Sequence, residues 1–298
     1  MTDGLVWERR EPLRRPLLVA AFSGWNDAGD AATGVADWLV RRQDPRRIAY
    51  IDPDEHVDYQ SHRPQIELVD GVTRAVTWPA NDCFAVALPE RDLVVLRGIE
   101  PNVRWRSFCN AVLAVARETD CEMVVTIGAL LGDVPHTRPV RVTGTASDPT
   151  LVTGLELRRS QYEGPTGIVG VLHDACRAAG VATASLWAPV PHYVSSPPNP
   201  PATRALLEHL AVLAGIELDL SGLDQLVDLW RVQVDHAIRE DDEVSSYVRE
   251  LEGRLDADDA GERGIILGGH PAGGGTVPDA EELAAEVEQF LREQDGGG

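Results

Sequence analysis

The segment between residues 23 and 30 carries residue types that could bind an anion. It follows an apolar run that predicts a buried strand, Leu17–Phe22, and it precedes a stretch with helical periodicity. Gly24 permits tight backbone geometry, and a strand-to-helix turn directs backbone N–H groups at a bound anion. Asn26 is the best polar side chain to contact a ligand there. Asp27 either lines the same site or simply caps the following helix.

A second polar group lies in a short segment between two prolines. His136, Thr137 and Arg138 combine an imidazole, a hydroxyl and a guanidinium, which together suit anionic oxygens. The alternative is a rigid surface loop in which Arg138 pairs with a carboxylate. Glu100, which follows another apolar run, is one such carboxylate. It could also hold ribose hydroxyls or pair with Arg104.

Further polar residues follow other predicted strands. His192 comes after the strand Ala182–Trp187 and could face the same ligand as His136, although a lone histidine is more often structural. Thr166 is the expected N-cap of a helix. Because ligands bind beyond the carboxyl ends of strands in such sheets, we expect a single cleft. The predicted ligand-binding residues are Gly24, Asn26, Asp27, Glu100, His136, Thr137, Arg138 and His192.

The signatures of several other chemistries are missing from the sequence. Cys83, Cys109, Cys121 and Cys176 form no Cys-x-x-Cys pair, so no metal site is predicted. No serine lies in a Gly-x-Ser-x-Gly elbow, and no nucleophile–base pair can be assigned. The catalytic residues are therefore unknown and enzymatic activity stays open. The chain contains no lysine to bind ATP phosphates, and no cofactor is predicted.

Short apolar runs alternate with helical segments, which indicates an α/β fold with a sheet covered on both faces. Two stretches without predicted helices, around residues 50–90 and 135–165, favour some antiparallel pairing, so the sheet should be mixed. The predicted strands are Leu17–Phe22, Ile48–Ile51, Val72–Trp78, Phe84–Leu88, Leu93–Leu96, Met123–Ile127, Val140–Gly144 and Ala182–Trp187. The predicted helices are Ala28–Val40, Trp105–Glu118, Gly167–Ala179 and Ala202–Ala214.

Composition and periodicity change near residue 218. We expect an α/β core over residues 1–218 and a helical hairpin at 219–255, with helices inside Ser221–Leu255. Residues 256–278 are acidic and then rich in Gly and Pro, which is typical of a flexible linker. Residues 279–298 should form a final amphipathic helix and a disordered tail.

The bulk composition limits the possible partners and compartment. The chain has 298 residues, 43% of them hydrophobic, and a formal net charge of −21. Such a charge repels nucleic acid and anionic lipid, so neither is an expected partner. No apolar run approaches the roughly 18–20 residues of a membrane-spanning helix, and the charged N-terminus does not resemble a signal peptide. A cytoplasmic protein is expected.

Four segments together resemble the bacterial branch of the proteasome assembly chaperone two family. They are Phe22–Asp30, Gly98–Trp105, Pro135–Pro139 and Gly164–Gly170, the last followed by Ser185–Tyr193. The resemblance covers about residues 15–250. It implies a three-layer αβα fold like that of nucleoside phosphorylases, with a helical C-terminal extension, but no settled reaction.

The resemblance implies an interaction or chaperone-like role, with a small polar cleft. It also implies a homo-oligomer, most simply a trimer, and a proteasome-related protein partner. The polar loops support an alternative function, in which a small-molecule enzyme or sensor binds a phosphorylated or nucleoside-like ligand. An anionic small molecule is therefore a second expected partner.

Overall fold

The apolar run that begins at Leu17 forms the centre of a nine-stranded mixed sheet in the computed structural model of the chain. The structure describes residues 4–42, 44–69, 71, 73–148, 158–159 and 163–260. Four neighbouring parallel strands make the middle of the sheet: β7 (Asp92–Ile99), β2 (Leu17–Ser23), β8 (Met123–Gly132) and β11 (Thr183–Pro191). Their carboxyl ends therefore lie at one edge, where the predicted site residues begin.

The outer strands add the antiparallel pairing that the helix-free stretches predicted. On one side β6 (Asn81–Ala87), β3 (Arg46–Ile51) and β1 (Leu5–Trp7) pair antiparallel in turn next to β7. On the other side β9 (Thr143–Ala146) pairs antiparallel with β11, and β10 (Arg158–Arg159) pairs parallel with β9. The predicted strand at Val140–Gly144 thus begins and ends later than expected.

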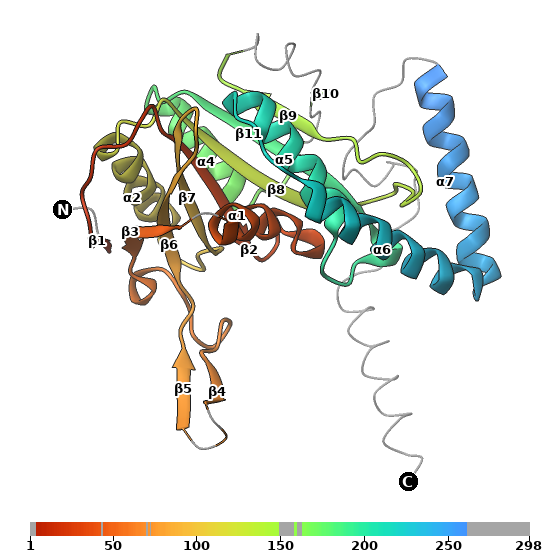
Figure 1. Cartoon of the computed structure of the whole chain (residues 1–298), viewed down its shortest axis with the longest axis horizontal. Helices are drawn as coiled ribbons and strands as arrows, with labels where there is room; N and C mark the ends of the chain where they lie inside the picture. The colour runs from red at the N-terminus through yellow and green to blue at the C-terminus, as the bar shows by residue number, and fades with distance from the viewer. Residues whose placement is uncertain are drawn as a thin grey trace. The chain divides into compact units, whose positions relative to one another are not determined.

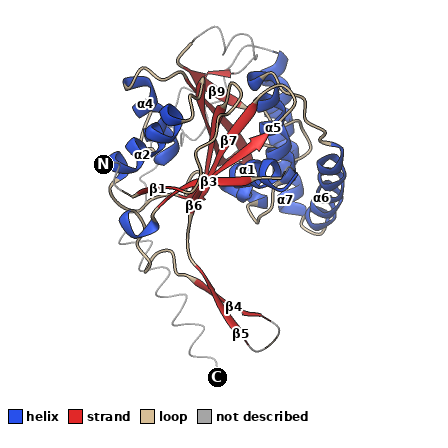
Figure 2. Cartoon of the chain, turned by 60° about the vertical axis from the view of Figure 1, so that its left-hand side comes forward, coloured by secondary structure: helices blue, strands red, loops and turns tan. Residues whose placement is uncertain are grey.

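Helices cover both faces of the sheet and make three layers (Figure 2). Helices α1 (Ala31–Arg42) and α5 (Pro200–Ala214) cover one face, and α2 (Trp105–Glu118) and α4 (Ile168–Ala178) cover the other. Successive strand residues point to opposite faces, so Leu17 and Val19 enter one core while Leu18 and Phe22 enter the second. The predicted α/β fold with a mixed sheet is confirmed.

Strands β4 (Gln65–Val69) and β5 (Thr73–Thr77) form a separate hairpin that extends away from the main sheet (Figure 1). Every residue of both strands is exposed. Ile66 lies directly across from Val76, and Leu68 shares their face by alternation. Each of the three exposes about half or more of its surface, at 60%, 48% and 63%.

Two long helices follow the core, α6 (Ser221–Arg239) and α7 (Asp242–Ala260). Asp241 caps α7, because its carboxylate accepts hydrogen bonds from the amides of Glu243 and Val244 at 3.0 and 3.1 Å. The helix continues past Leu255, so residues 256–260 are helical rather than part of the predicted linker. The rest of that linker and the predicted terminal helix lie outside the described residues.

Within the described part of the chain, no helix is long and apolar enough to cross a membrane. The same residues contain no cluster of three His, Cys, Asp or Glu side chains that could hold a metal ion.

Candidate functional site

The turn after β2 holds its polar side chains in internal hydrogen bonds. Asn26 is 1% exposed, and its Nδ2 donates to Glu100 Oε1 over 2.9 Å. Its backbone carbonyl accepts from the amide of Ala129 on β8 at 2.8 Å. Gly24 has φ of +124°, a conformation that side chains rarely adopt. The turn is therefore fixed to strand β8 and to the residue that follows β7.

Asp27 caps the helix that follows this turn. Its Oδ1 accepts from the amides of Ala32 at 2.7 Å and Thr33 at 3.1 Å, and its Oδ2 accepts from the Thr33 hydroxyl. Burial raises the pKa of the Asp27 carboxyl, and the hydrogen bonds from Thr33 and Ala32 oppose that rise. Both carboxylate oxygens thus accept hydrogen bonds from the start of α1. Asp27 therefore caps the helix, the second of the two roles considered for it.

Glu100 caps a second helix, α4, from a distant part of the chain. Its Oε1 accepts from the amide of Ile168 at 2.8 Å as well as from Asn26. Gly167 is the N-cap residue and makes no side-chain cap, so the expected cap by Thr166 is wrong. Of the two arginines predicted as partners of Glu100, Arg104 pairs with Glu55 and Arg138 pairs with carboxylates of α7. The carboxylate supplies the anion that a helix N-terminus favours.

A cavity of about 600 Å³ opens beside these residues. It extends along the sheet face formed by β8, β11 and β9, and α4 contributes Gly170 and His173 to its wall. Of the predicted site residues, Gly24, Asn26 and Asp27 line it. The other described lining residues are Trp25, Ala28, Gly29, Leu130, Leu131, Thr143, Thr145, Pro165, Thr166, Gly170, His173, Ser185, Trp187 and Ser195.

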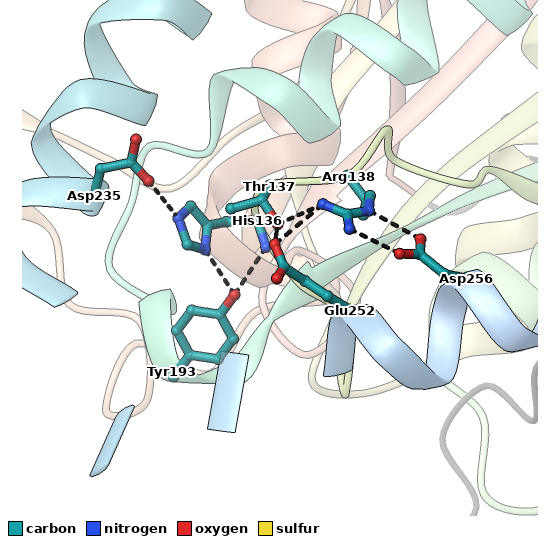
Figure 3. A network of polar contacts seen from close by, with 7 residues as sticks. All are labelled: His136, Thr137, Arg138, Tyr193, Asp235, Glu252 and Asp256. Atoms are coloured by element: carbon teal, nitrogen blue, oxygen red, sulfur yellow. Dashed lines mark hydrogen bonds and ion pairs between the residues drawn. The ribbon is translucent and has the colours of Figure 1, made fainter. Parts of the chain in front are cut away.

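The second half of the predicted site contacts helices α6 and α7 instead (Figure 3). Arg138 pairs with Glu252 at 3.1 Å and forms a two-pronged pair with Asp256 at 3.0 and 2.8 Å. Thr137 donates to Glu252 as well. Arg138 thus takes the carboxylate-pairing role that was its alternative, with α7 rather than with Glu100.

His136 is held between a tyrosine and an aspartate. The His136 amide donates to the Tyr193 hydroxyl over 2.8 Å, and that hydroxyl also lies 2.8 Å from Nδ1 of the same histidine. The Nε2 lies 3.0 Å from Asp235 Oδ1 on α6. If Tyr193 donates to Nδ1, Nε2 carries the proton and donates to Asp235, so every polar hydrogen is used. Burial raises the pKa of Tyr193 to about 12, which keeps its proton in place.

The eight predicted residues therefore fall into two groups. Gly24, Asn26 and Asp27 line the large cavity, with Glu100 bonded directly behind them. His136, Thr137 and Arg138 bond to α6 and α7, and the first and last of them border a space of about 20 Å³, room for roughly one water molecule. His192 lies 3.3 Å from Asp133 and packs edge-on against two tyrosines, Tyr193 and Tyr247. The prediction of a single cleft lined by all of them has no support in these contacts.

Several cavity residues were not among the predicted ones. Ser185 and Trp187 alternate along β11, and Thr143 and Thr145 alternate along β9, so each pair shares one face of its strand. The alternation with a period of two can be read from the sequence. The sequence does not show which face of the sheet these residues occupy, because that depends on which helix packs over the strands.

The PAC2 family model matches residues 21–238. A PAC2 family protein from Streptomyces avermitilis is 50% identical, with a TM-score of 0.73, over 78% of this chain and 99% of its own. The Mycobacterium tuberculosis proteasome-assembly chaperone homologue Rv2125 is 45% identical, with a TM-score of 0.72 and the same coverage.

More distant structures share the fold. PbaB of Pyrococcus furiosus, an archaeal proteasome activator, is 15% identical, with a TM-score of 0.65 over 80% of this chain and 99% of its own. None of the curated proteins matches this chain significantly.

Proposed function

Because the chain belongs to the PAC2 family, we propose that it is a chaperone-like interaction protein that binds proteasome subunits. The observation that carries the proposal is the 45% identity to the mycobacterial proteasome-assembly chaperone homologue, which this chain matches over 99% of that protein's length. Among the described residues that line the cavity of this chain, no serine is hydrogen-bonded to a histidine, and Ser185 bonds to Thr126 and Trp187 instead. The interaction role therefore has better support than catalysis. The cytoplasm is the compartment that this role requires.

The β4–β5 hairpin is the surface that we assign to the protein partner. Its exposed face presents Ile66, Leu68 and Val76, and Trp78 beyond the strand end is 55% exposed. A lone two-stranded hairpin is marginally stable by itself, and exposed contiguous apolar side chains are typical of protein interfaces. A proteasome subunit surface would bury these side chains.

The proposal includes self-association as a homo-oligomer, most simply a trimer. An anionic small molecule remains a prediction for the loop residues, and their contacts argue against it. Asp27 and Glu100 already occupy the helix N-termini, while Arg138 is neutralised by two carboxylates of α7.

Co-elution with purified bacterial proteasome α and β subunits tests the interaction. We expect the wild-type chain to co-elute with the subunits, or with a half-assembled particle, in size-exclusion chromatography. The double variant Ile66→Ser/Leu68→Ser should fold normally and lose this co-elution. Absence of co-elution with any subunit would overturn the proposed function.

A matched control separates two uses of the hairpin. Val232 on α6 is an apolar residue about as exposed as Ile66 and Leu68, at 66%, so Val232→Ser makes the same kind of change on another surface. This variant should co-elute like wild type. If the hairpin variant instead falls to a lower oligomeric mass, the hairpin serves self-association and its assignment to the proteasome contact is wrong.

A further inference from the structure

One face of the sheet is unusually polar where it borders the large cavity. Three neighbouring strands place Thr126 beside Ser185 and Ser185 beside Thr145, and Thr143 lies across from Trp187. The opposite face of the same strands carries aliphatic residues such as Ile127 and Leu186, which enter the core. Burying hydroxyl groups on a covered sheet face costs free energy unless each of them has a hydrogen-bond partner.

The cavity also offers aromatic ring surface. Trp187 can lie over β8 only because residue 128 is glycine, since a Cβ there would be 2.6 Å from the indole. Trp25, which is 64% exposed, also lines the cavity. Indole faces stack well on flat, unsaturated rings. Glycine at 128 and tryptophan at 187 thus form a platform for a planar group.

Hydrogen-bonding capacity is left over around this platform. Ser185 accepts from Thr126 and from Trp187 Nε1, each at 2.9 Å, so its own proton can be donated. The Thr143 hydroxyl and Asn26 Oδ1 are buried and have no hydrogen-bond partner. Buried polar atoms are nearly always bonded in folded proteins, and each of these two retains hydrogen-bonding capacity beside the cavity.

The described part of the lining carries no charge that favours an anionic ligand. Among the described lining residues there is no arginine, and the only carboxylate is Asp27. Burial lowers the pKa of His173, whose Nδ1 lies 3.3 Å from the Thr183 hydroxyl, so this imidazole is neutral at pH 7. A phosphate beside these described residues would face the Asp27 carboxylate, and none of their side chains would supply a countercharge.

We propose that this cavity binds an uncharged ligand of the nucleoside class, with its flat heterocycle against Trp187 and its hydroxyl groups bonded to the Thr143, Thr145 and Ser185 side chains. A volume of about 600 Å³ lies within the roughly 300–1,000 Å³ of small-molecule pockets. The indole of Trp187 suits the heterocycle of a nucleoside, and the serine and threonine hydroxyl groups of the strands suit its sugar hydroxyls. This site is independent of the proteasome interaction.

Isothermal titration calorimetry with adenosine, uridine and AMP tests the assignment on the full-length chain. We expect adenosine, uridine or both to bind. Where adenosine binds, AMP should bind at least about tenfold more weakly, because the described lining residues offer its phosphate no countercharge. Absence of heat with both nucleosides, or AMP binding as tightly as a nucleoside that does bind, would overturn the proposal.

The double variant Thr143→Val/Thr145→Val places the ligand in the cavity. Valine keeps the shape of threonine and the strand propensity, so folding should be preserved, and its melting temperature reports this. Each lost neutral hydrogen bond should weaken nucleoside binding about 3- to 10-fold. Thr77→Val, on an exposed strand away from the cavity, is the control and should bind like wild type. Equal affinity of the double variant and the control would show that the ligand binds elsewhere, and the assignment would fail.

Discussion

Glu100 shows how much one carboxylate can organise. It bonds to Asn26 in the turn after β2 and to the first amide of α4, so a single side chain connects three segments of the chain. Asp27 likewise accepts hydrogen bonds from backbone amides in the first turn of α1. Two helix N-termini at the carboxyl edge of the sheet are thus occupied by the protein's own carboxylates, which leaves little positive dipole for an external anion.

Replacing Glu100 tests this organising role. Glu100→Ala removes hydrogen bonds to a charged acceptor and should lower the free energy of unfolding by about 1.5–3 kcal/mol. Glu100→Gln keeps an acceptor oxygen, so it should lower the free energy of unfolding by less than Glu100→Ala does. Urea denaturation of the three proteins measures the difference. If Glu100→Ala is as stable as wild type, the carboxylate is not what holds α4 to the turn.

Gly167 gives a second prediction at the residue scale. A Cβ at this position would lie 2.0 Å from Asn26 Nδ2, which is itself bonded to Glu100. We expect Gly167→Ala to break that bond and to destabilise the fold by about 1–3 kcal/mol, the usual cost of overpacking.

Gly253 is the matched control for this change. It lies within α7, and a Cβ there would meet nothing within 4 Å. Gly253→Ala should stabilise the chain by about 0.5–1 kcal/mol through helix propensity. Thermal unfolding of both variants compares them, and a similar loss in both would mean that the close approach at Gly167 is unimportant.

At the scale of elements, α6 and α7 are attached to the core by polar side chains as well as by packing. His136 bonds to Asp235 of α6, and Arg138 pairs with Glu252 and Asp256 of α7. Val227, Trp230 and other apolar residues of the pair are buried. The segment that resembled an anion site thus anchors the C-terminal helices.

The attachment of α7 should depend on Arg138 and on pH. The hydrogen bond from Arg138 lowers the pKa of the Asp256 carboxyl. A carboxyl whose pKa is lowered on folding contributes its full stabilisation when the pH is above its ordinary pKa of about 4. That contribution disappears as the pH falls through the lowered pKa. Arg138→Ala should therefore speed amide exchange in α7 at pH 7, and the difference from wild type should shrink near pH 3.

Arg254 provides the control for this experiment. It pairs with Glu250 one turn away on the same helix, so this ion pair does not join α7 to the core. Amide exchange in Arg254→Ala should match wild type at both pH values. Hydrogen-exchange mass spectrometry resolves α7 from the core, and unchanged exchange in Arg138→Ala at pH 7 would contradict the anchoring role.

At the scale of the whole molecule, the net charge of −21 sets a condition on self-association. Copies of an acidic chain repel one another, so contacts between them must be apolar or must pair local charges. We predict a trimer, which multi-angle light scattering would report as about three times the 32.4 kDa chain mass. A mass near that of one chain at micromolar concentration would contradict the prediction. Added salt should favour association, because it screens the repulsion.

The sequence by itself determined the α/β class and most of its elements. Helix α2 begins and ends where its periodicity predicts, because one apolar stripe fixes both its face and its length. The strands of the central sheet are continuous apolar runs, since both of their faces are covered. Strands β1 and β4 were missed, because edge and hairpin strands bury little and carry a weak apolar pattern.

The sequence also located polar residues at strand ends, but only the tertiary structure decided what each of them contacts. Hydrogen-bond partners such as Glu100 with Ile168, or Arg138 with Asp256, lie 68 and 118 positions apart. No local spacing encodes such pairs, because they depend on how strands order in the sheet and where α7 packs. Periodicity fixes which residues share a face, whereas packing fixes whether that face meets a helix, a cavity or solvent.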